Sequence, residues 1–223
     1  MPRIKPRREE NTRGRLLEAA AEVFAEKGFQ GATTREIAAR ARANIASLHY
    51  HFQDKRRLYL AVFERFLDRM WADYPLPKEL EEPLPPHRRL AVFVESALRR
   101  LLEEGRPAWM WKLALREMSD PTDALDIVIQ RVSRPLFTAL ARIVRELLQP
   151  RAPEEMVRLC AASIAGQCLF YRFAHPIVER LLPGQKFNSA AMARLSSHIT
   201  QFSLAAIRSL RTRREAVRRR AMP

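Results

Sequence analysis

The spacing of the apolar residues constrains this chain most, because it repeats every three to four residues almost from end to end. Such a spacing places one apolar stripe on an α-helix. The first stripe consists of Leu16, Leu17, Ala20, Val23 and Phe24. Six glycines in 223 residues also argue against a turn-rich β fold or a glycine-rich nucleotide loop. The sequence therefore predicts an all-α protein of about nine helices.

Capping signals divide the first part of the chain into four helices. Gly28 fits the end of the first helix. Thr33, Asn44 and Asp54 can each cap the N-terminus of one of the next three. Two short helices joined by a tight connection near residues 41–43 have the arrangement of a helix-turn-helix.

Five prolines between residues 75 and 86 separate this head, a three-helix helix-turn-helix domain followed by the fourth helix, from a larger helical body. In the body, the helical pattern resumes at about 87–104, 107–118, 122–148, 153–173 and 188–210. Pro135 is expected to kink or split the third of these segments. The predicted organisation is a flexible basic arm at 1–11, a helix-turn-helix head at 12–74, a proline-rich linker at 75–86, a ligand-binding and dimerisation body at 87–212, and a basic tail at 213–223.

The charge is concentrated at the two ends of the chain. Forty Lys and Arg against 25 Asp and Glu give a net charge of +15. Residues 1–60 hold 13 basic and 7 acidic side chains, and residues 208–220 hold seven arginines and one glutamate. This asymmetry indicates a polyanionic partner, either nucleic acid or an anionic membrane surface. The N-terminal arm either enters a minor groove or only raises solubility.

Several classes of protein are disfavoured by the sequence. No apolar run has the length of a membrane span and the N-terminus lacks a signal peptide, so a cytoplasmic protein without membrane insertion is expected. Cys160 and Cys168 lack metal-ligand spacing, and we expect buried, apolar cysteines. His49 and His51 point apart on a helix and cannot share a metal. No catalytic motif appears, so neither enzyme activity, a metal nor a cofactor is expected.

The segment from Thr12 to Phe63 resembles the DNA-binding domain of the TetR family of transcriptional regulators. It carries the A-x-x-x-F-A-x-K-G-F spacing, T-T-x-x-I-A, Y-H-F and F-x-x-K in register. Residues 115–173, with LREMSDPTDALDIVIQRVSRPLF and LCAASIAGQCLFYRFAHP, are similar to the CecR-like (YbiH-like) branch. The resemblance implies a ligand-responsive repressor that binds a palindromic operator in double-stranded DNA. It also implies a homodimer formed through the helices at about 153–173 and 188–210, and release by a small-molecule effector of unknown identity.

By the same resemblance, nine residues are expected to contact DNA: Thr33, Thr34, Arg35, Asn44, Ser47, His49, Tyr50, His51 and Lys55. His49 departs from the family, in which tyrosine is more usual. Arg42 departs as well, because the family normally has glycine in this turn. If the backbone there has a positive φ, an arginine costs roughly 1–2 kcal/mol.

Five residues of the body are candidates for the effector site: Trp109, Trp111, Arg116, Gln167 and Tyr171. The two tryptophans either stack on a ligand or pack in the core. Gln167 and Tyr171 share one helix face and need polar partners, from either a dimer interface or an effector. The alternative function is a sequence-indifferent, basic protein that binds DNA or anionic membranes. Sequence preference separates the two, since charge alone does not read bases.

Overall fold

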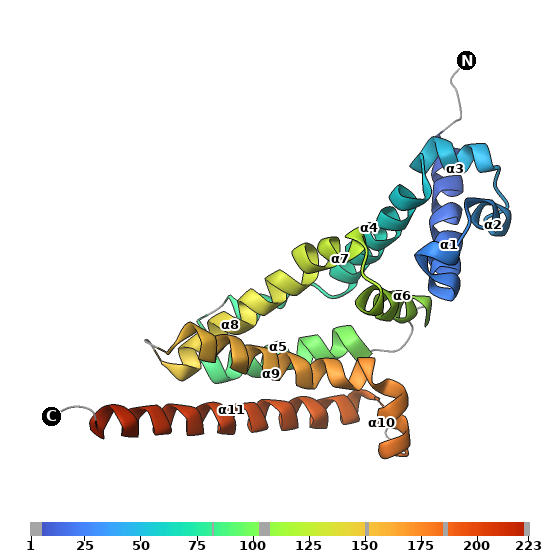
Figure 1. Ribbon diagram of the computed structural model, residues 1–223. Coiled ribbons are helices and arrows are strands. Elements are labelled where there is room, and N and C mark those ends of the chain that lie inside the picture. Colours follow the sequence, from blue (N-terminus) through green and yellow to red (C-terminus); the bar gives the residue numbers. More distant parts are fainter. Residues whose placement is uncertain (1–5, 82, 103–107, 150–151, 185–186, 221–223) are drawn as a thin grey trace. The chain divides into compact units, whose positions relative to one another are not determined.

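The computed structural model describes residues 6–81, 83–102, 108–149, 152–184 and 187–220, and within them the regular structure is helical (Figure 1). The all-α prediction is confirmed for these residues. They form two compact units. The first unit consists of the described residues of Met1–Ala72 and Gly105–Val132, and the second of those of Asp73–Glu104 and Ser133–Pro223.

The first unit has the capped helices that the sequence predicts. Its helices are α1 (Pro6–Gly31), α2 (Thr34–Arg40), α3 (Ile45–Phe52), α4 (Lys55–Asp73), α6 (Ala108–Ser119) and α7 (Asp123–Val128). Gly28 interrupts the helical backbone with φ 72° and ψ 177°, where an end was expected. The side chains of Thr33 and Asn44 cap α2 and α3. The carboxylate of Asp54 accepts from the Arg57 N–H at 2.8 Å in the first turn of α4.

The division into units differs from the single break expected at 75–86. Helices α6 and α7, which were expected in the body, pack with the helix-turn-helix instead. Arg116 of α6 donates to the carbonyls of Ala25 and Glu26 at the end of α1, at 2.9 and 2.6 Å. Leu113 of α6 is buried in the same core as α1. Helices α6 and α7 therefore follow the proline-rich segment in the sequence but pack in the first unit. The positions of the prolines alone do not predict this packing.

A buried carboxylate joins three helices of the first unit. Glu117 of α6 is 2 % exposed and accepts the hydroxyl of Tyr59 from α4 at 2.6 Å. Its other oxygen accepts from the N–H and hydroxyl of Thr122 and from the Leu125 N–H at the start of α7. Burial and this carboxylate raise the pKa of Tyr59, so its phenol remains a hydrogen-bond donor.

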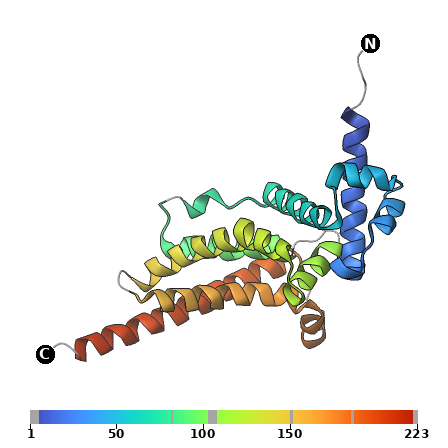
Figure 2. The same ribbon diagram turned by 45° about the horizontal axis from the view of Figure 1, so that its top comes forward.

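The second unit is a bundle of long helices. Its elements are the 3₁₀ helix η1 (Lys78–Leu80), α5 (Pro86–Leu102), α8 (Arg134–Leu148), α9 (Glu154–Phe173), α10 (His175–Leu181) and α11 (Ser189–Arg220). Helices α9 and α11 lie side by side and run in opposite directions (Figures 1 and 2). Short helix α10 was not expected from the sequence.

Pro135 splits its helical segment, as predicted. Between α7 and α8 lies η2 (Ile129–Ser133), a turn of π-helix, and Pro135 stands in the first turn of α8. The splitting follows from proline chemistry, because a proline removes an N–H from the helical ladder.

The two ends of the described chain are more helical than expected. Helix α1 begins at Pro6, so residues 6–11 of the predicted flexible arm are helical; residues 1–5 lie outside the described residues. Helix α11 continues to Arg220, so most of the predicted tail is helical, and residues 221–223 lie outside the described part.

Both cysteines are free thiols in the second unit. Cys168 is 2 % exposed, and burial raises the pKa of its thiol to about 12. Cys160 is half-buried, and desolvation raises its pKa as well. Among the described residues, no three His, Cys, Asp or Glu side chains lie together in a group that could hold a metal ion. None of the described helices is long and apolar enough to cross a membrane.

Candidate nucleic-acid interface

Helix α3 buries one face and leaves the other uncovered in the first unit. Leu48 is fully buried and Phe52 is 4 % exposed, and they attach α3 to the core of α1, α2 and α4. The opposite face presents Ile45, His49 and Tyr50, of which Tyr50 is 75 % exposed. A short helix held rigidly by its apolar side can enter a major groove with the other.

The turn between α2 and α3 is a Schellman motif. The Ala43 N–H bonds to the Ala38 carbonyl at 2.9 Å, and the Arg42 N–H bonds to the Ala39 carbonyl at 3.0 Å. Arg42 therefore stands at the left-handed position, with φ 49°. Its conformation is the one that glycine adopts freely, and an arginine there costs about 1–2 kcal/mol.

The capping side chains keep donor groups for another partner. Thr33 Oγ1 accepts from the Glu36 N–H at 3.2 Å, and its hydroxyl proton is not used by this contact. Asn44 Oδ1 accepts from the Ala46 N–H at 2.9 Å, which leaves its amide NH₂ as the donor group. Hydroxyl and amide donors at helix N-termini are typical phosphate contacts in protein–DNA complexes.

The first turn of α2 and the rest of α3 supply the other predicted contacts. Arg35 is exposed and Thr34 is half-buried at the start of α2. Ser47 and His51 are half-buried on α3, and the His51 ring lies edge-on to Tyr50 with centroids 5.1 Å apart. The nine predicted residues thus all lie on α2, α3 and their flanks, but they differ in exposure.

The ring of His49 has a fixed orientation. Its Nδ1 lies 2.8 Å from the carbonyl oxygen of Gln53. A carbonyl oxygen can only accept, so Nδ1 carries the proton in this contact. The exposed Nε2 is then an acceptor in the neutral ring and a donor in the protonated ring.

Lys55 is held more tightly than the sequence suggests. Its ammonium donates to the carbonyls of Ala32 at 3.1 Å and Gln30 at 3.4 Å, and lies 4.7 Å from the centre of the Phe29 ring. These contacts attach the start of α4 to the end of α1. An ammonium has three protons, so one donor is left for a phosphate.

One residue of the exposed face was not predicted. Ile45 follows the Asn44 cap and is 40 % exposed. Isoleucine is usually a core residue. Only the orientation of α3 shows that Ile45 points outward. An exposed apolar side chain beside a helix N-terminus suits contact with a thymine methyl group.

Arg40 belongs to a salt-bridge cluster instead of the interface. Its guanidinium binds both carboxylate oxygens of Glu26, at 2.8 and 2.9 Å, and lies near Glu22 and Glu36. The hydrogen bond from Arg40 lowers the pKa of Glu26. This cluster joins α1 to α2 and helps fix the helix-turn-helix.

The five effector candidates divide between the two units. In the first unit, Trp109 packs on Phe66 with ring centroids 6.5 Å apart, Trp111 is half-buried, and Arg116 holds the end of α1. In the second unit, Gln167 donates to the Ser163 carbonyl at 3.3 Å and to the Ser203 hydroxyl of α11 at 3.4 Å. The Tyr171 ring lies edge-on to Phe187 at 6.3 Å.

These features define a helix-turn-helix protein with a second, helical unit. The sequence model of the bacterial regulatory proteins of the tetR family matches residues 16–62. The model of the C-terminal domain of the HTH-type transcriptional dual regulator CecR matches residues 86–207. The chain therefore belongs to the tetR family of DNA-binding transcriptional regulators, with a C-terminal domain of the CecR type.

Individual relatives agree with this assignment. The HTH-type transcriptional dual regulator CecR of Shigella flexneri is 31 % identical over 171 residues, which are 73 % of this chain and 76 % of that protein. The HTH-type transcriptional repressor KstR2 of Mycobacterium tuberculosis is 42 % identical over 62 residues, 28 % of this chain and 31 % of the repressor. The regulator FadR from Bacillus subtilis, solved with stearoyl-CoA, shares the fold with a TM-score of 0.57 and 17 % identity, over 86 % of this chain and 97 % of that one.

Proposed function

We propose that this protein is a homodimeric repressor that binds a palindromic operator and is released by a small-molecule effector. The observation that carries this proposal is the uncovered face of α3, which presents Ile45, His49 and Tyr50 from a helix locked by Leu48 and Phe52. Nothing in the described part of the first unit covers that face. The repressor name of one relative and the dual-regulator name of another support a role in controlling transcription.

In this proposal the contacts divide into two kinds. Thr33, Asn44 and Lys55 contact phosphates, because each keeps a donor beside a helix terminus. Ser47 and His49 read base edges from α3, with Ile45 against a methyl group. The exposed Nε2 of a neutral His49 would accept a hydrogen bond from an adenine or cytosine amino group.

The second unit offers a face for a partner subunit. Helix α9 exposes Leu159 by 62 % and Phe170 by 47 %, and α11 exposes Phe202 by 60 %. Leu159 and Phe170 are eleven residues apart, which places them on one stripe of α9. Gly166 lies on the same stripe, and a methyl group built on it would touch nothing within 4 Å. Because a glycine inside a helix costs about 1 kcal/mol, close approach of a second chain explains its place here.

The interior of the second unit carries polar groups that suit an effector. Ser196, Thr200 and Ser203 of α11 are 8, 6 and 3 % exposed and recur on one helix face. Ser203 bonds to Gln167, whereas the Thr200 hydroxyl is buried without a hydrogen-bond partner in the described structure. A buried hydroxyl without a partner is costly, and a polar group of an effector would supply one. The stearoyl-CoA bound by FadR makes an acyl-CoA one candidate class.

An effector would act by favouring one arrangement of the dimer over another. In the proposed dimer, helix α3 of each subunit is the recognition helix, and the two must reach successive major grooves about 34–36 Å apart. A ligand that binds more tightly to a dimer with a different separation of these helices lowers DNA affinity. The size of the effect equals the ligand's differential affinity for the two states.

Selection of binding sites from a random duplex pool tests the base-reading roles. We expect a palindromic consensus, and Ser47→Ala should change the preferred base at one position of each half-site.

Lys55→Ala should instead weaken binding on all sequences and reduce the slope of log affinity against log salt concentration by about one. Lys112→Ala, an exposed lysine of α6, is the matched control and should leave the slope unchanged. An unchanged slope in Lys55→Ala would remove Lys55 from the phosphate contacts.

The second candidate function is a sequence-indifferent polyanion-binding protein, favoured by the arginine-rich end of α11. It would give no consensus in the same selection, and its binding would fall steeply with salt. The absence of enzyme activity and a cytoplasmic location stay predictions from the sequence.

A further inference from the structure

Arg13 of α1 is held by an aromatic ring and not by a carboxylate. Its guanidinium carbon lies 5.2 Å from the centre of the Phe52 ring. Among the residues whose side chains the structure describes, no Asp or Glu forms an ion pair with Arg13. Several other arginines of the first unit do have carboxylate partners: Arg40 pairs with Glu26, Arg56 with Asp123, Arg65 with Glu18, and Arg131 with Asp68.

The way in which Arg13 is held leaves its hydrogen-bond donors available. A guanidinium has five N–H donors in a planar fork, and a ring face attracts its positive charge without offering an oxygen acceptor. The ring itself is fixed, because Phe52 is 4 % exposed and belongs to the core of the first unit. Arg13 is exposed. The core therefore places an exposed guanidinium whose donors can bind another molecule.

Arg13 lies at the C-terminal end of α3. Phe52 is the last residue of that helix, and its ring centre lies 6.1 Å from the centre of the His51 ring. Helix α3 packs against α1 in both views of the fold (Figures 1 and 2). Phosphates line both edges of a major groove, so a helix that lies in the groove has phosphates beside each of its ends. In the proposed complex Asn44 serves the N-terminal end of α3, and Arg13 is placed to serve the other.

We propose that Arg13 contacts the DNA backbone and binds one phosphate through two parallel hydrogen bonds. Arginine favours this bidentate geometry with phosphate, and Phe52 acts as the positioning residue. The proposal rests on the proposed function, because it requires that α3 enters the major groove. It adds a contact from α1, whereas the predicted contacts all lie on α2, α3 and their flanks. Since a phosphate carries no base identity, Arg13 strengthens binding to every sequence.

Fluorescence-anisotropy titrations at a series of salt concentrations test the proposal, with the full chain on the selected palindrome and on a shuffled duplex. We expect Arg13→Gln to weaken binding to both duplexes by a similar factor, about tenfold for the loss of a charged, bidentate contact. The slope of log affinity against log salt concentration should fall in magnitude by about one. Arg13→Lys should keep the slope, because the charge stays. It should still bind more weakly than the natural chain, because lysine cannot form the two parallel hydrogen bonds.

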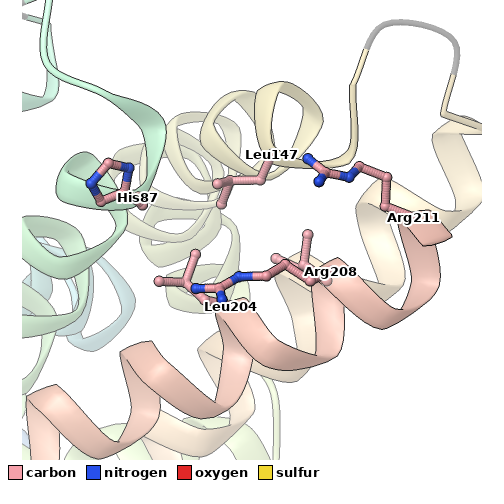
Figure 3. A pocket seen from close by; sticks show the side chains of 6 residues that line it. His87, Leu147, Leu204, Arg208 and Arg211 are labelled. Atoms are coloured by element: carbon pink, nitrogen blue, oxygen red, sulfur yellow. The ribbon is translucent and has the colours of Figure 1, made fainter.

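Arg208→Gln is the control for net charge. Arg208 belongs to α11 of the second unit, where it lines a cleft of about 330 Å³ together with His87, Leu147 and Leu204 (Figure 3). Arg13 and Arg208 are both exposed arginines, so each variant removes one positive charge from the chain. Arg208→Gln should leave the slope unchanged and change the affinity less than about twofold.

The outcomes separate this contact from the function on which it rests. Equal weakening in Arg13→Gln and Arg208→Gln would mean general attraction to a basic chain and would overturn the contact. So would an unchanged slope in an Arg13→Gln variant whose circular dichroism is native. If the natural chain still preferred its palindrome in either case, the proposed function would stand and only the role of Arg13 would be wrong. Equal affinity of the natural chain for both duplexes would contradict the proposed function, and the contact with it.

Discussion

Arg42 occupies a backbone conformation that most side chains avoid. With φ 49° it completes the Schellman motif that ends α2, where two backbone hydrogen bonds fix the turn. The side chain is exposed. The arginine places a basic group beside helix α3, where a DNA phosphate would pass in the proposed complex.

Replacing Arg42 by glycine should therefore raise stability and weaken DNA binding. We expect Arg42→Gly to raise the free energy of unfolding by about 0.5–1 kcal/mol, since relief of the positive φ exceeds the added entropy of the unfolded chain. Urea denaturation measures the change. Arg42→Ala is the control, because it removes the guanidinium but keeps the strained Cβ and should give no gain. Equal stability of the two variants would contradict the account of this turn.

Several single residues behave as their sequence context predicts, whereas others depend on contacts that no local pattern contains. Thr33, Asn44 and Gly28 have local signals, and the structure confirms each cap or interruption. Lys55 has the expected position, but its carbonyl contacts come from residues more than twenty positions earlier. The outward orientation of Ile45 follows from the packing of Leu48 and Phe52, which the sequence alone leaves ambiguous.

The π-helical turn η2, which precedes Pro135, is attached to α4 through Arg131. In a regular α-helix the Arg131 carbonyl would accept from the N–H of residue 135, which proline lacks. Instead, Trp71 Nε1 of α4 donates to this carbonyl at 3.0 Å. Arg131 also pairs with Asp68 of α4 at 2.6 Å. Because Pro135 has no N–H, the Arg131 carbonyl can accept the hydrogen bond from Trp71, which attaches the end of α4 to η2.

A double-mutant cycle tests this coupling. Trp71→Phe should lower the free energy of unfolding by about 1 kcal/mol in the natural chain through the lost hydrogen bond. In the Pro135→Ala background the restored N–H competes for the carbonyl, so the same change should cost at least about 0.5 kcal/mol less. Urea denaturation of the four proteins gives the coupling. Costs that add without coupling would show that the two residues act separately.

Helix existence was predicted well, and the grouping of helices was not. The apolar stripes and Pro135 gave α5, α8, α9 and the split before α8, because these depend on local spacing. The return of α6 to the first unit depends on Arg116 and Leu113 meeting α1, about 90 residues away in sequence. Periodicity carries no information about such distant partners.

In the whole molecule, formation of the proposed dimer depends on Gly166, where the two chains are expected to approach closely. Gly166→Arg should leave the fold of a single chain intact, since a side chain at this position meets open space within its own chain. Alanine at the same position is the control and should keep the dimer, because a methyl group is small. Sedimentation equilibrium should show a dimer for the natural chain and a monomer for Gly166→Arg. A dimer in both would place the interface elsewhere.

The most direct test of the central claim is a fluorescence-anisotropy titration on the selected palindrome and on a shuffled duplex of the same composition, at a fixed near-physiological salt concentration. The account predicts a preference of about a thousandfold or more for the palindrome. It also predicts saturation at two chains per duplex. Equal affinity for both duplexes, or saturation at one chain per palindrome, would contradict a sequence-specific dimeric regulator.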